Sequence, residues 1–492
     1  MNTPTTKRRI AIDPISRVEG HGKITLLMDQ DNHVQEARLH IVEFRGFEKF
    51  IQGRPFTEVP YFVQRLCGIC PVSHHLAAAK AVDQLVGVDP EQLTPTTNKL
   101  RRLLHFGQVL QSHALHFFHL SSPDLLFGFG SNLVQRNIVG VLEAYPDIGL
   151  KGVKLRKYGQ QVIAAIAGKR IHGAATVPGG MNKALSNEER KALLVDIKDI
   201  IQWSQDAVEL NEQIHLQHPE NHGFATLVTR YLGMIGKQGE MELYHGGLRA
   251  CHADGAPIID QFDYTHYTQL LREEVRSWSY MKFPYITSLG KEHGWYRVGP
   301  LARVNLADFI ATPKAETVRQ RFRAFAQGAY VHDTLAYHWA RMIEMLHCAE
   351  AIEALLHDPD IMGTDLVVKG TSRREGIGVI EAPRGTLFHH YQINEQGLIE
   401  KANLIVSTTS NNQAMNDSVR SVANEYLEGR EEITEGLLNH LEVAVRAYDP
   451  CLSCATHALG KMPLQVQLVN AQGEVVSQLA RHMDGRIECD FE

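Results

Sequence analysis

Two cysteine pairs constrain the fold of this chain more than any other feature of its sequence. Cys67 and Cys70 form one Cys-x-x-Cys near the start of 492 residues, and Cys451 and Cys454 form another near the end. Two residues between cysteines let both sulfurs face one ion, so this spacing recurs in zinc, iron-sulfur and redox sites. Pairs in a compact zinc ribbon are roughly 15–20 residues apart. These four thiols can therefore meet only if a large fold brings both regions together.

The composition is that of a globular protein in a reducing compartment. Lys and Arg (50) nearly balance Asp and Glu (56), and the net charge of −6 argues against an electrostatic nucleic-acid binder. Seven cysteines cannot all pair, which argues against a secreted disulfide scaffold. The first residues lack the apolar core of a signal peptide, and no stretch of the sequence is apolar enough to span a membrane. We therefore expect a cytoplasmic protein that neither binds nucleic acid nor inserts into a membrane.

Hydrophobic periodicity predicts a mainly helical chain with small antiparallel β elements, an α+β fold. Strand-like alternation indicates a hairpin within residues 10–44, strands within 377–406 and a further hairpin at 464–479. Residues 218–262 show no clear pattern and are expected to be mostly irregular. The helical period of 3.6 marks the segments 61–85, 96–127, 131–143, 153–168, 186–217, 316–357 and 412–446.

The chain offers no obvious domain boundary. A prior of about 150 residues per domain would suggest three units, but the sequence contains no internal repeat and no low-complexity linker. We therefore predict one intertwined, mainly helical domain whose two Cys-x-x-Cys segments converge on a buried metal site.

Residue chemistry alone leaves the identity of the metal open. Four thiolates are soft ligands that suit nickel, copper(I), zinc or iron, and a sulfur can also bridge two metals. A large interaction subunit stapled by zinc is therefore one alternative. For either pair taken alone, buried cysteines that pack as small hydrophobic side chains are another.

The residues around the cysteines resemble the two metal signatures of nickel-iron hydrogenase large subunits. Arg65 and His74 accompany the first pair, and Asp449, Pro450 and His457 accompany the second. The other blocks that resemble the family follow in the expected order and are Arg17-Val18-Glu19-Gly20-His21, Phe44-Arg45-Gly46-Phe47-Glu48, Pro178-Gly179-Gly180 and Glu381-Ala382-Pro383-Arg384-Gly385. The resemblance covers nearly the whole chain and implies the long-helix fold of that family.

The resemblance implies a site that splits H2 heterolytically. Nickel would be held by Cys67, Cys70, Cys451 and Cys454, and Cys70 and Cys454 would also bridge to an iron that carries carbonyl and cyanide ligands. The Cys451 thiolate and then Glu19 would take the proton. Burial in an apolar site raises the pKa of a glutamate toward the working pH, which suits that role. From residue type alone, an exposed carboxylate is the simpler interpretation of Glu19.

Three further side chains acquire roles from the resemblance. The permanent charge of Arg384 would stand over the open metal position, although a salt-bridged surface arginine is the plainer interpretation. Thr408 would donate a hydrogen bond to a cyanide, with Ser407 as the alternative. His74 would hydrogen-bond a bridging sulfur, with His75 as the competing choice.

Glu48 and His457 resemble the ligands of a magnesium ion that ties the two ends of the fold together, with Glu43 as a substitute for Glu48. A histidine nitrogen suits magnesium less well than a carboxylate, so iron or manganese is an alternative. The remaining candidates are expected to pack in the core: His113, His116 and His119, which share a helical face, and Cys251 and Cys348.

The resemblance also implies partners and processing. Large subunits of this type are trimmed after the last histidine, so a maturation endopeptidase would remove residues 458–492, with Cys489, once nickel-insertion proteins have acted. Residues 1–457 would then form the working catalytic domain.

The electron acceptor must lie on another polypeptide. The chain offers no nicotinamide fold, flavin site or ferredoxin-like cysteine run, which implies a small iron-sulfur subunit. Segments 42–50, 280–285 and 455–464 look most like cytoplasmic NAD-coupled enzymes, whose diaphorase module carries FMN. Related hydrogenases coupled to deazaflavin, NADP or heterodisulfide are the close alternative.

Overall fold

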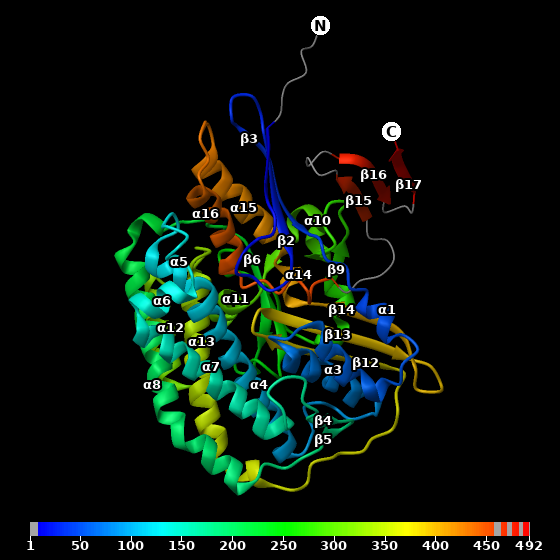
Figure 1. The fold of residues 1–492 in the computed structure, drawn as a ribbon. Helices are drawn as coiled ribbons and strands as arrows, with labels where there is room; N and C mark the ends of the chain where they lie inside the picture. Colours follow the sequence, from blue (N-terminus) through cyan, green and yellow to red (C-terminus); the bar gives the residue numbers. More distant parts are fainter. Residues whose placement is uncertain (1–7, 457–463, 470–474, 482–485, 492) are drawn as a thin grey trace.

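The computed structural model describes residues 8–456, 464–469, 475–481 and 486–491. Long helices occupy one side of the molecule and small sheets the other, and the N-terminal sheet rises above both (Figure 1). The longer helices are α3 (Pro71–Leu85), α4 (Pro95–Leu115), α7 (Pro146–Ala167), α8 (Asn187–Gln217), α12 (Pro313–Phe325), α13 (Ala336–His357), α15 (Asn412–Leu427) and α16 (Glu435–Ala447). The shorter helices are α1 (Phe47–Ile51), α2 (Val59–Phe62), α5 (Ser122–Phe127), α6 (Ile138–Ala144), α9 (Tyr267–Leu270), α10 (Gly290–His293), α11 (Pro300–Leu306) and α14 (Ser407–Ser410). Across the described residues, no helix combines the length and the apolar character that crossing a membrane requires.

The strands form several small sheets. The larger sheets have the orders β1-β2-β3, β11-β6-β7-β8, β12-β13-β14 and β15-β16-β17, and β4 with β5 and β9 with β10 form two-stranded ribbons. Their bounds are β1 (Arg8–Ile12), β2 (Gly22–Met28), β3 (Val34–Ile41), β4 (Thr176–Val177), β5 (Gly180–Met181), β6 (Arg230–Ile235), β7 (Gly247–Cys251), β8 (Pro257–Phe262), β9 (Leu271–Glu274), β10 (Phe283–Ile286), β11 (Tyr296–Arg297), β12 (Glu375–Ala382), β13 (Gly385–Ile393), β14 (Ile399–Ile405), β15 (Leu464–Val469), β16 (Val475–Arg481) and β17 (Ile487–Phe491).

The predicted hairpins are confirmed, because β2 pairs with β3 and β15 with β16 in antiparallel register. The pairing of β11 with β6 is parallel, which the prediction of antiparallel strands did not include.

The long helices begin and end at the expected capping residues. Ser186 caps α8 and forms a reciprocal capping box with Glu189, so the helix predicted over 186–217 is confirmed. Helix α7 begins earlier than predicted, at Pro146, because proline is well suited to a first helical turn. It ends at Gly168, whose φ of 74° is a backbone conformation that glycine adopts without strain.

A π-helical turn, His116–Ser121, joins α4 to α5 within the segment predicted as helix over 96–127. This wider turn changes the register of the helix. The His116 ring stacks on His338 with a centroid separation of 5.5 Å, and its Nε2 lies 2.8 Å from the carbonyl oxygen of Arg446. His113 and His116 are fully buried, as expected for core packing, whereas His119 is only partly buried.

The prediction that residues 218–262 are mostly irregular is wrong for strands β6, β7 and β8. Five of the six residues of β6 are buried, so both of its faces lie in the core. A strand buried on both faces lacks the alternation of polar and apolar residues by which strands are recognised.

The helical stretch predicted over 316–357 is two helices, α12 and α13. Between them Gln327 and Gly328 have φ angles of 54° and 85°, which no α-helix accommodates. The stretch 412–446 is likewise divided into α15 and α16, with Gly429 at φ 70° in the connection. Hydrophobic periodicity continues through these breaks because both helices of each pair face the same core.

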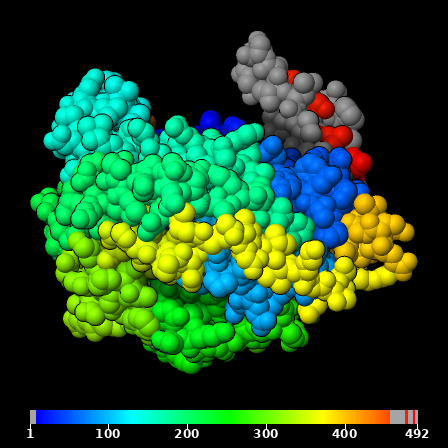
Figure 2. Space-filling model, turned by 90° about the horizontal axis from the view of Figure 1, so that it is seen from below, coloured from blue at the N-terminus to red at the C-terminus, as the bar shows by residue number. Residues whose placement is uncertain are grey.

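The β12-β13-β14 sheet packs directly against α3. A Cβ atom on Gly378 would lie 1.9 Å from the Ala77 carbonyl oxygen, so only glycine permits this close approach. The contact brings Cys70, at the start of α3, close to Arg384, at the turn between β12 and β13. Seen from below, the link from α13 to β12 crosses the molecule beside α3 (yellow in Figure 2).

A buried ion cluster joins four elements of the fold. The Arg303 guanidinium of α11 binds both carboxylate oxygens of Glu344 in α13, and its Nη1 lies 2.7 Å from Glu381 Oε2 in β12. His113 of α4 binds Glu344 at 2.9 Å. Burial disfavours the charge on Glu344, but the Arg303 charge and its hydrogen bonds outweigh this effect and lower the pKa of Glu344 to about 2.

Removing the arginine should destabilise the protein strongly. We expect Arg303→Met to cost on the order of 3–5 kcal/mol of unfolding free energy, because the buried carboxylates of Glu344 and Glu381 lose their counter-charge. Denaturant unfolding followed by circular dichroism measures the loss. The control is Arg374→Met, which removes an exposed pair with Glu395 (67% and 77% exposed) and should cost about 0–1 kcal/mol. Equal losses in the two variants would contradict this account.

Candidate metal centre

The four cysteine thiols lie together at one buried point, so the predicted convergence of the two Cys-x-x-Cys segments is confirmed. Cys67 follows the short turn before α3, Cys70 caps α3, and the other two belong to the loop after α16. The Sγ–Sγ distances are 3.3 Å for Cys67 and Cys451, 3.6 Å for Cys70 and Cys454, and 2.9 Å for Cys451 and Cys454. All four sulfur atoms lie within 4.8 Å of one another. Soft donors in this arrangement suit a transition metal.

The C-terminal cysteine loop is anchored by residues from distant parts of the sequence. Arg384 donates from Nε to the Asp449 carbonyl oxygen at 2.6 Å and from Nη2 to Asp449 Oδ1 at 2.9 Å. The backbone N–H of Cys451 donates to Thr408 Oγ1 at 3.0 Å. Asp449 has a φ of 54° and turns the chain toward the thiols. Arg384 is therefore a buried partner of this loop and not a surface arginine.

The electrostatics of the centre favour loss of a proton at one thiol. Hydrogen bonds from neighbouring thiols, Cys451 first, lower the pKa of Cys67, and the Arg384 charge acts in the same direction. Burial raises the pKa of Cys451 and of Cys454 well above the usual range of a thiol. A bound cation would deprotonate the remaining thiols, because the thiolate is the form that ligates metal.

Glu19 lies directly beside the thiols. Its Oε2 accepts hydrogen bonds from the Cys451 Sγ and from the Ser453 backbone N–H, both at 3.1 Å. Burial, and then the negative charge of Cys67, raise the pKa of Glu19. Arg17, two residues away in sequence, instead binds Asp124. The interpretation of Glu19 as an exposed carboxylate does not fit this geometry.

A small cavity adjoins three of the thiols and contains two polar groups without partners. Arg384 Nη1 and Ser73 Oγ are buried and form no hydrogen bond with the described residues. The cavity is lined by Cys70, Ser73, His74, Ala382, Pro383, Arg384, Leu387, Val406, Ser407, Thr408, Cys451 and Cys454. Ser73 was missed by the sequence analysis, although its position three residues after Cys70 in a helix placed it on the same face. Such donors next to soft ligands suit a small polar group bound to a metal.

The structure favours Thr408 over Ser407 as the hydroxyl that faces the centre. Ser407 Oγ donates to the carbonyl oxygen of Gly385 at 2.7 Å and is occupied by that contact. Thr408 Oγ1 accepts from Cys451, which leaves its own proton available to a neighbouring acceptor.

The geometry also distinguishes the two neighbouring histidines. His74 Nε2 lies 3.3 Å from Cys454 Sγ. His75 points the other way, where Nδ1 contacts the Pro60 carbonyl oxygen at 2.8 Å and Nε2 accepts from the Thr176 backbone. Burial lowers the pKa of His75 to about 4, as for a neutral histidine in a core. His75 is therefore a packing residue.

Glu48 and Glu43 occupy different places. Glu48 is buried, accepts from the Leu404 backbone N–H at 2.8 Å, and has a pKa raised by burial. Glu43 accepts from Ser453 Oγ at 2.9 Å, near the surface side of the cysteine loop. The other predicted ligand, His457, lies outside the described residues.

The remaining cysteines are separate from the centre. Cys251 and Cys348 are buried in the core, as expected, and burial raises the pKa of both thiols. The side chain of Cys489 lies outside the described residues.

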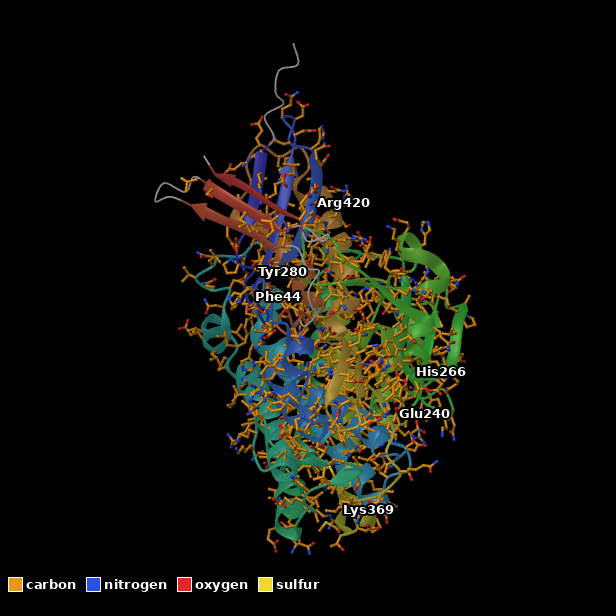
Figure 3. The ribbon with its side chains drawn as sticks, turned by 90° about the vertical axis from the view of Figure 1, so that its right-hand side faces the viewer. Phe44, Glu240, His266, Tyr280, Lys369 and Arg420 are labelled. Carbon is orange, nitrogen blue, oxygen red and sulfur yellow. The ribbon has the colours of Figure 1, made fainter. Side chains whose placement is uncertain are left out.

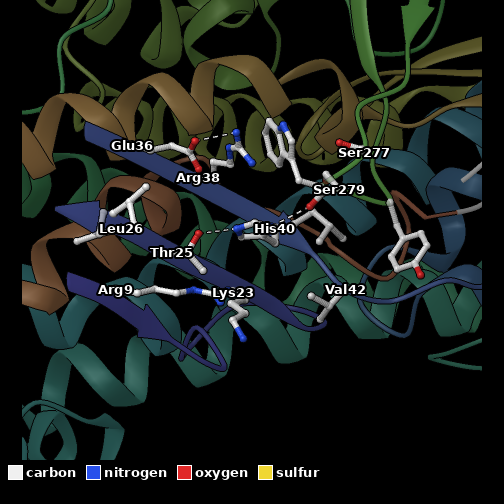
Figure 4. Close-up of a pocket in the computed structure, with 14 residues that line it drawn as sticks. Arg9, Lys23, Thr25, Leu26, Glu36, Arg38, His40, Val42, Ser277 and Ser279 are labelled. Atoms are coloured by element: carbon white, nitrogen blue, oxygen red, sulfur yellow. Dashed lines mark hydrogen bonds and ion pairs between the residues drawn. The ribbon is translucent and has the colours of Figure 1, made fainter. Parts of the chain in front are cut away.

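A surface groove beside the N-terminal sheet contains none of the candidate site residues (Figure 4). His40 joins its two walls, since Nε2 lies 2.6 Å from Thr25 Oγ1 and Nδ1 lies 2.8 Å from the Trp278 carbonyl oxygen. The Arg38 guanidinium stands 5.3 Å from the Trp278 ring centroid. These contacts fasten the sheet to the loop before β10.

Two of the segments singled out in the sequence adjoin each other at the surface. Phe44 and Tyr280 lie side by side below the N-terminal sheet (Figure 3), with ring centroids 5.8 Å apart. The Tyr280 N–H donates to the carbonyl oxygen of Ile41 at 3.0 Å. The segments 42–50 and 280–285 are therefore in contact at Phe44 and Tyr280.

Comparison with known proteins identifies relatives that match most of the chain. A HoxL-like family model matches residues 9–44, and a nickel-dependent hydrogenase model matches residues 45–126 and 244–457. The NAD-reducing hydrogenase HoxS subunit beta of Cupriavidus necator is 48% identical over 96% of this chain and 100% of its own. The matching polypeptide of the F420-non-reducing hydrogenase of Methanothermobacter thermautotrophicus is 39% identical over the same shares.

Solved structures agree with these matches. An NAD+-reducing [NiFe]-hydrogenase in the H2-reduced state has a TM-score of 0.90 and 56% identity, and 92% of this chain covers 100% of that chain. A [NiFeSe]-hydrogenase from Dm. baculatum, 23% identical with a TM-score of 0.74, shares the fold. Since the hydrogenase model includes both cysteine pairs and the relatives match along their whole length, this chain belongs to the nickel-dependent hydrogenase family as its large, metal-binding subunit.

Proposed function

We propose that this chain reversibly splits H2 at a nickel-iron centre and that partner subunits pass the electrons to NAD. The observation that carries the proposal is the convergence of four thiols at a buried point beside Glu19. NAD is favoured as the acceptor because the relative at 48% identity and the solved structure at 56% are both NAD-reducing enzymes. Coupling to deazaflavin, NADP or heterodisulfide is the second candidate, supported by the F420-non-reducing relatives at lower identity.

The donor set fits the proposed metals. Nickel would be held by all four thiolates, and iron by Cys70 and Cys454, whose sulfurs adjoin the cavity. The apolar wall of the cavity suits a carbonyl ligand. The unpartnered Arg384 Nη1 and the Thr408 hydroxyl would donate hydrogen bonds to cyanide ligands. If no metal-bound ligand accepted from Arg384, its buried Nη1 would stay without a hydrogen bond, which would cost about 1–3 kcal/mol of folding free energy.

Proton transfer would use the side of the centre where Glu19 lies. Bound nickel and iron supply the redox chemistry that takes up the electrons of H2. Cys451 would accept the proton and pass it to Glu19, which lies within hydrogen-bonding distance. Its raised pKa lets this carboxyl group both take and release a proton. Ser453, Glu43 and His21 continue from the loop toward the surface.

A second cation would tie the two ends of the chain together. Glu48 is a buried carboxylate close to β14, and His457 is its proposed partner as a ligand. A carboxylate suits magnesium, and the histidine nitrogen also admits iron or manganese.

The proposed enzyme is a cytoplasmic hetero-oligomer. Electrons would leave to a small iron-sulfur subunit, then to a diaphorase with FMN and further clusters, because this sequence offers no site for either cofactor. Nickel-insertion proteins and an endopeptidase would complete maturation by removing residues 458–492. Two observations support the trimming: the hydrogenase model ends at residue 457, and the solved relative is covered in full by 92% of this chain.

Metal analysis of the purified enzyme tests the central proposal. We expect about one nickel per chain, with infrared bands of carbonyl and cyanide bound to an iron atom that is additional to the iron of the partner clusters. Cys70→Ala should lose both metals because it removes a proposed bridging ligand, whereas Cys348→Ala, at a buried cysteine away from the centre, should retain them. Zinc in place of nickel, without such bands, would instead support the alternative function, an interaction subunit whose fold is held together by zinc.

Glu19→Gln tests the proton route. The variant keeps the shape of the side chain but cannot take up a proton, so H2/D2O exchange should fall by about 10²–10⁴-fold while nickel and iron remain bound. Glu58→Gln, at an exposed glutamate, serves as the control and should exchange normally. Unchanged exchange in Glu19→Gln would remove this residue from the mechanism.

Intact mass spectrometry tests the processing. Active, nickel-loaded protein should have the mass of a chain that ends at His457. An active chain that still carries Cys489 would refute the trimming.

A further inference from the structure

Three buried side chains form a continuous line of hydrogen bonds behind Cys454. His74 Nε2 lies 3.3 Å from the Cys454 sulfur, and His74 Nδ1 lies 3.1 Å from His389 Nε2. His389 Nδ1 in turn lies 2.5 Å from the Tyr391 hydroxyl. The family resemblance drew attention to His74 alone, so His389 and Tyr391 have no role in the function proposed above.

The position of these residues follows from the geometry of β13. His389 and Tyr391 are two residues apart in the strand, so their side chains point to the same face, toward α3. Both are fully buried. His390 points to the opposite face, where it contacts Glu375 at 2.7 Å and the Tyr267 hydroxyl at 3.0 Å.

Proton counting fixes the direction of the line. A thiolate that ligates metal has no proton, so His74 must donate from Nε2 to Cys454. A neutral imidazole has one donor and one acceptor, hence His74 Nδ1 accepts from His389 Nε2. His389 Nδ1 must then accept from the Tyr391 hydroxyl. Burial, with the nearby Glu48 carboxylate, raises the pKa of Tyr391 and keeps this phenol protonated.

We propose that Tyr391 and His389 are positioning residues that hold the Nε2–H of His74 on the Cys454 sulfur. The inference deepens the proposed function and rests on it, because it requires Cys454 to be a thiolate ligand. Hydrogen bonds in series strengthen one another. Outer partners of a metal ligand fix its orientation and tune the electrons of the metal.

The expected effect has a definite sign. A hydrogen bond to a bridging thiolate withdraws electron density from the sulfur and therefore from the iron. When the bond weakens, the iron returns more density to its carbonyl ligand, and the carbonyl stretching frequency falls. Removing Tyr391 or His389 should therefore lower this frequency without removing either metal.

Infrared spectroscopy of the purified holoenzyme tests the proposal. Tyr391→Phe keeps the ring but lacks the donor, so its carbonyl band should lie below that of the parent protein with the nickel and iron content unchanged. His389→Phe should shift the band further in the same direction. His390→Gln, one residue away on the opposite face of β13, is the matched control and should leave the band in place.

A double variant tests whether Tyr391 acts through His389. Because the line is serial, Tyr391→Phe should add no shift in a His389→Phe background. An equal shift in both backgrounds would overturn the proposal, as would a Tyr391→Phe band at the parent frequency.

A more conservative replacement covers the case in which the variants fail to load metal. Exchange of Tyr391 for 3-fluorotyrosine preserves the fold and strengthens the phenol as a donor, so the carbonyl band should rise. A fall would mean that Tyr391 accepts the bond and would also overturn the proposal. Parent protein without carbonyl or cyanide bands would instead refute the proposed function itself.

Discussion

The structure depends on closing two distant segments over four buried thiols. Nothing in the second cysteine segment could hold it there, because it is a loop with little regular structure of its own. Its position comes from hydrogen bonds to other parts of the chain. The Arg384 guanidinium donates to the Asp449 carbonyl oxygen, and the Thr408 hydroxyl accepts from the Cys451 N–H. The Glu19 carbonyl oxygen accepts from the Leu452 N–H. The β12-β13 turn, the start of α14 and the segment before β2 therefore all have to be in place before the site exists.

The same requirement explains the charged interior. Arg384 near the thiols and Arg303 in α11 are both buried, and each has a carboxylate partner. Asp449 pairs with Arg384, whereas Glu344 and Glu381 pair with Arg303. Buried charge of this kind adds little net stability but penalises any arrangement that separates the partners. The clusters therefore specify how the helices meet the β12-β13-β14 sheet, and with it the position of the metal centre.

The sequence predicts those parts of the site that are defined by residue type and spacing. Two Cys-x-x-Cys pairs indicate a shared ion, and their convergence is found here. It does not predict which polar atoms remain without a partner, since that depends on every neighbour in three dimensions. Ser73 is such a case, and the choice between Thr408 and Ser407 is another, because one hydroxyl is already occupied by Gly385.

The same distinction applies to the fold. Helix α8 follows from its period and its capping box, which are local properties of the chain. Strand β6 escapes detection because it is buried on both faces and shows no alternation. The π-turn at His116 is likewise hidden, since a register change within a helix leaves the hydrophobic pattern nearly intact.

The two sides of the thiol cluster differ in their access to solvent, and in the proposed function they have separate roles. Glu19 beside Cys451 is partly exposed, and the loop next to it continues through Ser453 to Glu43 near the surface. The line behind Cys454 ends at Tyr391, which is fully buried. The proposed exchange of protons with solvent therefore belongs to the first side. In the proposed function, a fixed line of donors on the second side keeps the Cys454 sulfur in a constant electrostatic environment while Cys451, whose sulfur lies 2.9 Å away, gains and loses a proton.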